Sequence, residues 1–133
     1  MNITITPYDD KFHKADVINW LQEENVMLPL NAPIGRYPKP KEFRAILGGF
    51  SDCTIEYNVT AIHWMADMQC GKSRVSIIVA FSGSEDDPFD YLSFGGDYEK
   101  IISIVKKLSQ ICGTFLLLHD GESPILILPE ENL

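Results

Sequence analysis

The sequence is poor in positive charge. Its 11 lysine and arginine residues stand against 19 aspartate and glutamate residues, which gives a formal net charge of −8. Proteins that bind nucleic acid neutralise phosphates with lysine and arginine, so we expect no nucleic-acid partner. The same acidic field would accelerate encounter with a basic protein, although an acidic balance also serves solubility alone.

Long apolar runs are also lacking. The longest, residues 124–129, is far below the ~20 residues that a membrane-spanning helix needs. The N-terminal residues lack the basic and apolar regions of a secretory signal. We therefore expect a cytoplasmic protein without a membrane partner.

Cysteine is scarce as well. Cys53, Cys70 and Cys112 are odd in number and show no paired spacing. In a protein without an export signal, this pattern is typical of reduced thiols, so we expect no disulfide. Cys112 should be inert through burial in a helix, and Cys70 should be accessible at a hairpin tip.

Groups that hold metals or cofactors do not gather in the sequence. His13, His63 and His119 are isolated from one another, whereas a metal site needs several converging ligands. Gly71-Lys72-Ser73 resembles the end of a phosphate-binding loop, but that motif needs a glycine where Ala66 stands and a helix afterwards. We expect no metal and no cofactor.

The last third of the chain indicates the fold class. Asp97 precedes a helical apolar stripe that reaches Cys112, and Gly113 follows as a C-cap. Two apolar strands are expected next, over 114–118 and 124–128. Because both are apolar on both faces, each should be central or covered on two sides.

The remaining pattern is mostly β. Alternating apolar residues predict a first strand around Ile3 and Ile5, and a change of parity near 61–62 predicts a bulge or a break within 53–68. A hairpin at 69–73 and a return strand over 75–81 follow. A short strand over Tyr91–Phe94, a helix from Asp9 or Asp10 to about Glu24 and a shorter helix over 41–47 complete the elements.

These elements predict one α+β domain over residues 1–133. We expect a mostly antiparallel sheet with one long C-terminal helix and one N-terminal helix packed on it. Residues 25–40 contain Pro29, Pro33, Pro38 and Pro40 and form the longest irregular segment. Loops of that length are often functional.

The best catalytic candidate is His119 with Asp120. The pair follows a predicted strand, where active-site groups often lie, and a carboxylate beside a histidine can orient its ring. No nucleophile motif accompanies the pair, and Asp120-Gly121 is also a common turn. A structural turn is the simpler interpretation.

The best partner-binding candidate is the segment 85–91. Its acids have no basic residue between Arg74 and Lys100 to offset them, and two aromatics accompany them. Acids and aromatics together are typical of the rim and anchors of a protein interface. The predicted partner-binding residues are Glu85, Asp86, Asp87, Phe89, Asp90 and Tyr91.

A helix that ends at Gly113, an apolar strand, an Asp-Gly turn at 120–121 and a strand led by Pro124 follow one another over Asp97–Leu128. This arrangement resembles the C-terminal part of some small bacterial immunity proteins of contact-dependent or polymorphic toxin systems. The resemblance implies a protein that neutralises a toxin domain by binding it, and it assigns no binding residue.

The sequence thus favours a non-catalytic binding or inhibitor protein, with a basic toxin domain as one candidate partner. Two alternatives stay open. One is a small enzyme or ligand-binding domain that uses His119 and Asp120 near residues 25–40. The other is a subunit that forms a homo-oligomer through an exposed strand edge.

Overall fold

A computed structural model describes residues 2–8, 14–29, 31–60, 63–81, 83–119 and 122–129, with the backbone alone at 14–17 and 63. In chain order, the elements are β1 (Asn2–Pro7), α1 (Lys14–Glu23), α2 (Pro40–Gly48), β2 (Thr54–Val59), β3 (His63–Cys70), β4 (Ser73–Ala80), β5 (Tyr91–Gly96), α3 (Tyr98–Cys112), β6 (Phe115–His119) and β7 (Ile125–Ile127).

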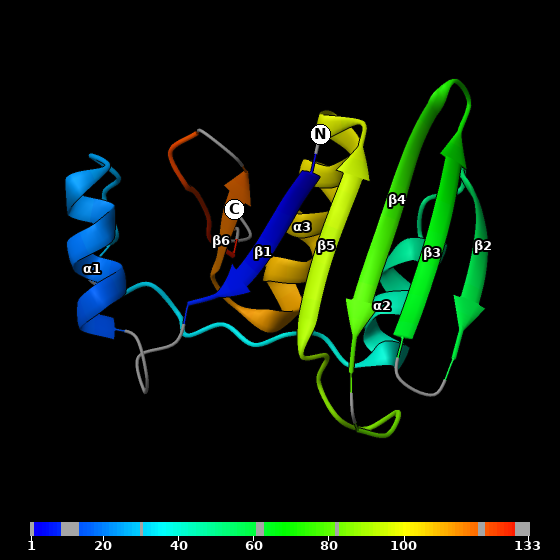
Figure 1. The fold of residues 1–133 in the computed structure, drawn as a ribbon, viewed down its shortest axis with the longest axis horizontal. Coiled ribbons are helices and arrows are strands. Elements are labelled where there is room, and N and C mark those ends of the chain that lie inside the picture. Colours follow the sequence, from blue (N-terminus) through cyan, green and yellow to red (C-terminus); the bar gives the residue numbers. More distant parts are fainter. Residues whose placement is uncertain are drawn as a thin grey trace.

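The described strands form a seven-stranded sheet in the order β2-β3-β4-β5-β1-β6-β7 (Figure 1), and each neighbouring pair is antiparallel. This confirms the predicted α+β class and the mostly antiparallel sheet. Hairpins join β2 to β3, β3 to β4 and β4 to β5, whereas β1 is inserted between β5 and β6. The predicted strand over 114–118 is therefore interior, since β6 lies between β1 and β7.

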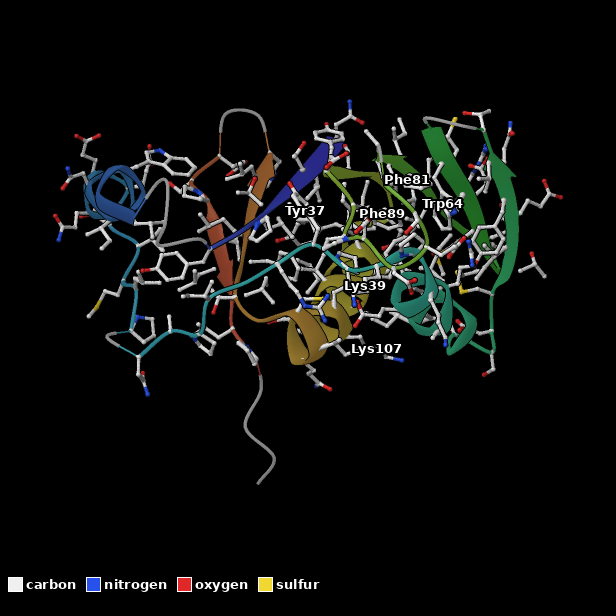
Figure 2. The ribbon with its side chains drawn as sticks, turned by 90° about the horizontal axis from the view of Figure 1, so that it is seen from below. Tyr37, Lys39, Trp64, Phe81, Phe89 and Lys107 are labelled. Carbon is white, nitrogen blue, oxygen red and sulfur yellow. A yellow bond between two sulfur atoms is a disulfide. The ribbon has the colours of Figure 1, made fainter. Side chains whose placement is uncertain are left out.

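Two helices cover one face of this sheet. In Figure 1, α2 and α3 lie behind the strands, and Figure 2 shows them as a layer below the sheet. Alternate side chains of the strands point into this layer and are buried, among them Ile5, Ile77 and Phe94. The core therefore lies between one sheet face and two helices.

The N-terminal helix does not take part in that layer. α1 lies beside the sheet, at its β6–β7 end (Figure 1), and no described side chain of α1 belongs to the main core. The prediction that an N-terminal helix packs on the sheet is not confirmed, since α2 lies beside α3 in that layer. The C-terminus of α1 is a Schellman turn, in which Asn25 adopts φ 58° and the Val26 N–H donates to the Leu21 carbonyl at 2.8 Å.

The long C-terminal helix matches its predicted bounds. The Asp97 side chain accepts a hydrogen bond from the Lys100 N–H at 3.3 Å, which caps the N-terminus. Gly113 follows Cys112 with φ 96°, and a Cβ there would lie 2.2 Å from the Ile34 carbonyl oxygen. The glycine is thus required both for the backbone turn and for the close approach of residues 34–35.

Strand β7 differs from its prediction. It is only three residues long and forms one edge of the sheet, although a central or doubly covered strand was expected. Ile127 is nevertheless 7% exposed, and the Ser109 hydroxyl on α3 lies 3.3 Å from its carbonyl oxygen. The helix thus covers one face of β7, and a continuous apolar run did not require a second covering layer.

Of the bulge or break that was predicted near 61–62, the structure has a break between two strands. Val59 of β2 lies opposite Trp64 of β3, so the change of parity marks a reversal of the chain. Residues 61 and 62 themselves lie outside the described residues. The hairpin at 69–73 is confirmed, because Gly71 and Lys72 connect Cys70 to Ser73 and β4 follows where a phosphate-binding loop would need a helix.

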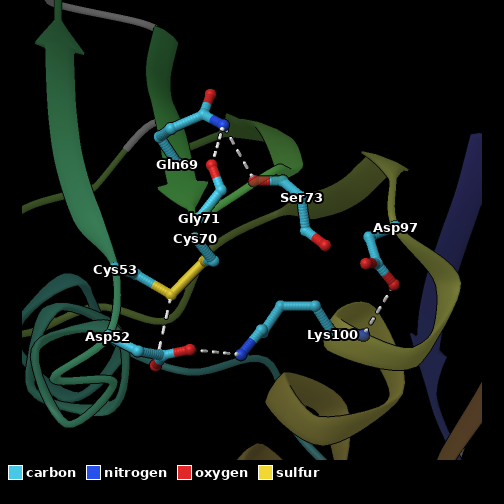
Figure 3. The surroundings of a disulfide bond; sticks show 8 residues. All are labelled: Asp52, Cys53, Gln69, Cys70, Gly71, Ser73, Asp97 and Lys100. Atoms are coloured by element: carbon cyan, nitrogen blue, oxygen red, sulfur yellow. Dashed lines mark hydrogen bonds and ion pairs between the residues drawn. A yellow bond between two sulfur atoms is a disulfide. The ribbon is translucent and has the colours of Figure 1, made fainter.

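A disulfide joins Cys53 to Cys70 (Figure 3), so the prediction of three free thiols was wrong. The reason is the register of β2 and β3: Thr54 lies opposite Gln69, which places the residues just beyond them, Cys53 and Cys70, face to face. Cys70 is also 8% exposed, contrary to the accessible thiol that was expected. Cys112 remains a free thiol, and its burial raises its pKa to about 11.

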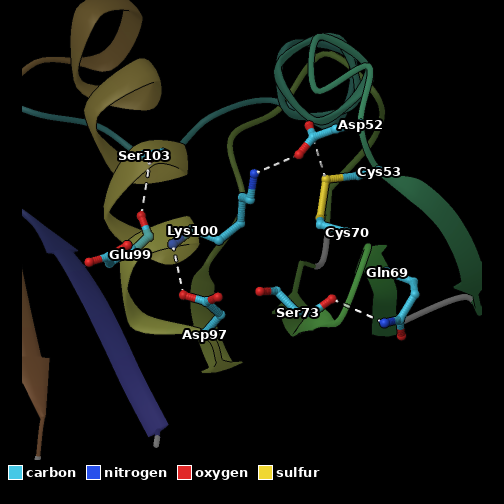
Figure 4. Close-up of polar contacts among 9 residues, drawn as sticks. All are labelled: Asp52, Cys53, Gln69, Cys70, Ser73, Asp97, Glu99, Lys100 and Ser103. Atoms are coloured by element: carbon cyan, nitrogen blue, oxygen red, sulfur yellow. Dashed lines mark hydrogen bonds and ion pairs between the residues drawn. A yellow bond between two sulfur atoms is a disulfide. The ribbon is translucent and has the colours of Figure 1, made fainter.

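Polar contacts bind the disulfide region to α3. Lys100 Nζ donates to Asp52 Oδ2 at 3.1 Å, which lowers the pKa of that carboxyl group (Figure 4). The Lys107 ammonium lies 4.2 Å from the centre of the Phe50 ring, within the range of a cation–π contact. The turn before β2 is thus held against the outer side of α3.

The irregular segment 31–39 is hydrogen-bonded both to the end of α3 and to β1. The Arg36 N–H donates to the Cys112 carbonyl at 2.9 Å, and the Tyr37 hydroxyl donates to the Ile5 carbonyl at 3.0 Å. Arg36 then forms two hydrogen bonds with the Glu42 carboxylate, at 2.7 and 2.8 Å, and Glu42 also accepts the Lys39 N–H at 2.9 Å. Glu42 therefore fixes this segment to the first turn of α2.

Replacing Glu42 with glutamine should reduce stability in a pH-dependent way. The Arg36 hydrogen bonds lower the pKa of Glu42 from 4.5 to about 2 in the folded protein. Its contribution is therefore complete above the unfolded pKa and is lost as the pH falls from about 5 towards about 2. We expect Glu42→Gln to cost about 1 kcal/mol at neutral pH, because both side chains are partly exposed.

Urea unfolding of the two proteins at several pH values tests this. The difference between wild type and Glu42→Gln should shrink as the solution is acidified. A difference that stays constant down to about pH 2 would show that this carboxylate is not the responsible group.

Candidate protein-binding surface

The face of the sheet that looks out of Figure 1 carries no described helix. We call it the open face. Strand register assigns its residues, because directly opposite residues of antiparallel strands share a face. From β2 to β6, they include Glu56, Asn58, Met65, Asp67, Arg74, Ser76, Ile78, Tyr91, Ser93, Thr4 and Leu118.

Three large apolar side chains are exposed in the middle of the open face. Met65 is 44% exposed and lies directly opposite Ile78, which is 47% exposed. Tyr91 on the next strand is 41% exposed, and its hydroxyl lies 3.4 Å from the Thr4 hydroxyl. Single exposed apolar residues are ordinary, but a group on adjacent strands is typical of an interaction surface.

A shallow hollow continues this apolar group towards β6. Its volume is about 610 Å³, and it is lined by Asn2, Thr4, Ile78, Tyr91, Ser93, Leu118 and His119. The hydroxyl and amide groups among these side chains can accept and donate hydrogen bonds. An apolar centre with hydrogen-bonding groups around it is the composition of a protein-binding surface.

The β2–β3 end of the open face is acidic. Glu56 and Asp67 lie directly opposite each other, an arrangement that costs stability because like charges repel. Arg74 donates to Asp67 at 3.1 Å and Ser76 donates to it at 3.2 Å, whereas no described group pairs with Glu56. A cationic group from outside could relieve this repulsion.

The predicted partner-binding residues do not form one surface. Phe89 is 2% exposed and its ring packs against Phe43, Trp64 and Phe81, so its interpretation as an exposed anchor was wrong (Figure 2). The aromatic beside the acids fills the core because the β4–β5 loop folds towards α2, where the Phe89 N–H donates to the Pro38 carbonyl at 2.9 Å.

The acids of that loop serve different contacts. Glu85 pairs with Arg44 of α2, and Asp87 accepts the Ser84 N–H at 2.9 Å within a turn. Asp86 and Asp90 are exposed. Tyr91 alone among the predicted residues lies on the open face, so the structure separates it from the loop acids that precede it.

The histidine candidate gains no catalytic geometry in the described structure. Asp120 lies outside the described residues. The centre of the His119 ring is 6.1 Å from that of Tyr98 on α3, a distance within the range of aromatic contacts. Within the described part of the chain, no group of three or more histidine, cysteine or acidic residues could hold a metal ion.

A larger cavity lies beside α1. Its volume is about 730 Å³, and residues of α1 and of the segment 25–34 line it, with Leu21, Met27 and Ile34 among them. Gln22 and Asn25 are polar, and the described lining contains no charged side chain. His119 does not line this cavity.

No protein-family model, curated protein or solved structure matches this chain. Among the helices that the structure describes, none is long and apolar enough to cross a membrane. The open face must therefore be interpreted from its own chemistry. Met65 and Ile78 were not among the predicted binding residues, because apolar residues on both sides of a strand predict burial. Glu56 and Asp67 could have indicated the exposed face, because charged side chains are costly to bury and their side of the sheet cannot be a buried core.

Proposed function

We propose that this chain is a non-catalytic protein-binding protein and that its open face docks a basic protein domain. The observation that carries the proposal is the exposed apolar group of Met65, Ile78 and Tyr91 on adjacent strands. Such a group supplies the area that leaves water on binding, which is the main source of affinity.

Charge supports a basic partner. The chain has a net charge of −8, and Glu56 faces Asp67 beside the apolar group. A lysine or arginine of the partner placed there would remove a repulsion that the free protein retains. Acidic groups at a rim also accelerate association with a basic surface.

A toxin domain is the specific partner class that we propose. Many toxin domains are basic because they act on nucleic acid, so an acidic binding face would be complementary to them. The resemblance of Asp97–Leu128 to the ends of bacterial immunity proteins supports the same class. A gene for a large toxin next to the gene for this chain would supply the protein to be tested.

Ile78→Asp should weaken that complex by about 10- to 100-fold, because it places a charge in the apolar centre. Ile111→Asp is the matched control, since Ile111 is 50% exposed but lies on α3. Calorimetric titration of wild type and both variants into the toxin domain measures the effect. If both substitutions weaken the complex equally, or if neither weakens it, the open face is not the interface.

Association kinetics separate the open face from the acidic loop. Glu56→Gln should lower the association rate at low salt and have little effect at high salt. If the loop forms the interface, neutralising Glu85, Asp86 and Asp87 together should lower the association rate at low salt, and Glu56→Gln should not. The variant whose effect disappears with salt identifies which acids the partner meets.

A second candidate function rests on the cavity beside α1. A cavity of about 730 Å³ without charged lining suits a neutral, largely apolar small molecule. Ala32→Trp should fill part of it and abolish the binding of an apolar fluorescent probe. Unchanged probe binding would place the probe elsewhere.

A further inference from the structure

The two edges of the sheet differ in how they are protected against further strand pairing. β7 has three residues and lies between Pro124 and Pro129. β2 has six residues, Thr54–Val59, and contains neither proline nor lysine, which are residues that commonly block edge pairing. The β2 edge is therefore open to another strand.

The β3–β4 hairpin shows which β2 residues present their backbone to that edge. Cys70 and Ser73 flank the two-residue turn at Gly71 and Lys72. The residues flanking such a turn bond to each other, so the backbone groups of Cys70 point to β4. Because this direction alternates along a strand, those of Gln69 point to β2, where they meet Thr54.

The same alternation continues along β2. Backbone groups of Thr54, Glu56 and Asn58 point to β3, and those of Ile55, Tyr57 and Val59 point to the free edge. The Cys53 and Cys70 Cα atoms are 4.1 Å apart, which fits the closely spaced, non-hydrogen-bonded kind of pair expected next to Thr54–Gln69. The hairpin geometry and the Cys53–Cys70 Cα distance thus agree on which β2 residues point their backbone groups to the free edge.

We propose that β2 pairs with β2 of a second copy of this chain, antiparallel and with Tyr57 on the two-fold axis. The sheets of the two copies then continue into each other. This register places Ile55 opposite Val59 of the partner subunit, and it uses all three outward-facing residues in about six backbone hydrogen bonds.

Charge and apolar surface favour this register. In this register Glu56 lies opposite Asn58 of the partner subunit. A two-fold axis at Glu56 would instead place two carboxylates opposite each other. It would also require backbone groups of Glu56 that already bond to β3. Tyr57 and Val59 are 41% and 51% exposed. The second copy would cover both, since opposite residues share a face and Ile55, Tyr57 and Val59 lie on the helix-covered side.

This pairing uses the β2 edge and leaves Met65, Ile78 and Tyr91 uncovered. The Ile78→Asp test of the proposed function is therefore distinguishable from the tests of the dimer. A two-fold axis perpendicular to the sheet turns both open faces to the same side. A dimer would then present two equal binding faces side by side.

Sedimentation equilibrium of the full chain should show a monomer–dimer equilibrium. Asn58→Glu creates two symmetric glutamate pairs with Glu56 and should raise the dimer dissociation constant by about tenfold or more. The double variant Glu56→Lys/Asn58→Glu turns both pairs attractive and should restore dimerisation. Asn19→Glu adds the same charge on the exposed side of α1 and should leave the constant unchanged.

Cysteine crosslinking tests the register itself. Tyr57→Cys places two thiols opposite each other at the axis, where Cα atoms of a hydrogen-bonded pair lie about 5.5 Å apart, within disulfide range. In Asn58→Cys the two thiols are diagonal, with Cα atoms about 7–8 Å apart, and should not join. Only the first variant should give a crosslinked dimer on mild oxidation.

Three results would overturn the proposal. One is a monomer at all concentrations up to about 0.5 mM, which would put any dissociation constant in the millimolar range or above. Another is a dimer that Asn58→Glu does not weaken or that the double variant does not restore. The third is equal crosslinking at positions 57 and 58, which would mean contact without this register.

Discussion

Replacing Phe43 with alanine is expected to lower the free energy of unfolding by about 3–5 kcal/mol, the range for a fully buried phenylalanine. Phe43 is 0% exposed on α2, and its ring lies 5.5 Å from Trp64 and 5.7 Å from Phe89, centre to centre. It joins α2 to β3 and to the β4–β5 loop at once. Its removal would leave a cavity that these separate elements cannot close together.

Phe81→Ala is the matched control for this prediction. Phe81 is only partly buried, and its ring contacts Phe89 at the margin of the same cluster. Its truncation should cost clearly less, about 1–2 kcal/mol, because solvent and neighbouring side chains can fill the space. Chemical denaturation that gives equal losses for both variants would show that Phe43 is not the centre of the cluster.

The elements of this fold were readable from the sequence where local signals agreed. Asp97 and Gly113 mark the two ends of α3, because a capping carboxylate and a glycine with positive φ affect only the neighbouring helix turn. The alternation of Val75, Ile77 and Val79 predicted a strand at the position of β4, where the structure buries these three residues. These signals depend on nearest neighbours and need no knowledge of the fold.

The incorrect predictions all depended on how distant segments meet. Phe89 lies among acids in the sequence, but the loop direction that buries it is set by Pro38 and by α2. The place beside α3 could have been taken by either short helix, and only the assembled structure gives it to α2. The open face also required strand order, since Met65 and Ile78 are neighbours only once β3 and β4 pair.

The cysteine pairing shows this limit most clearly. Cys53 and Cys70 are 17 residues apart, and no local spacing marks them as partners. Their pairing follows from the β2–β3 register, which places Thr54 opposite Gln69. A parity change in the sequence predicted a bulge or a break, but it did not predict a reversal of the chain that aligns these two residues.

Reducing the Cys53–Cys70 disulfide is expected to lower the free energy of unfolding by about 3 kcal/mol, the value for closing a loop of this length in the unfolded chain. The bond restrains β2, which has a neighbouring strand on only one side within the described sheet. Urea unfolding with and without dithiothreitol measures this loss. A Cys53→Ala/Cys70→Ala variant should start with similarly reduced stability and show no response to the reductant.

Thiol counting provides the control for that experiment. Without reductant, the unfolded wild type should expose one reactive thiol, Cys112, and with reductant it should expose three. Cys112→Ala should abolish the single thiol and leave the reductant response of stability intact. Three thiols in protein purified without reductant, or stability indifferent to dithiothreitol, would contradict a stabilising disulfide.

The same measurement bears on the predicted cytoplasmic location. Reducing compartments keep thiols free, whereas disulfides persist in oxidising ones. If the bond forms only after purification, then in the cell β2 is held by its β3 hydrogen bonds and by contacts such as Tyr57 with Trp64. Trapping thiols with an alkylating agent at the moment of lysis distinguishes the two. Alkylation of Cys53 and Cys70 would support the cytoplasmic prediction, and protection of both would argue for an oxidising compartment.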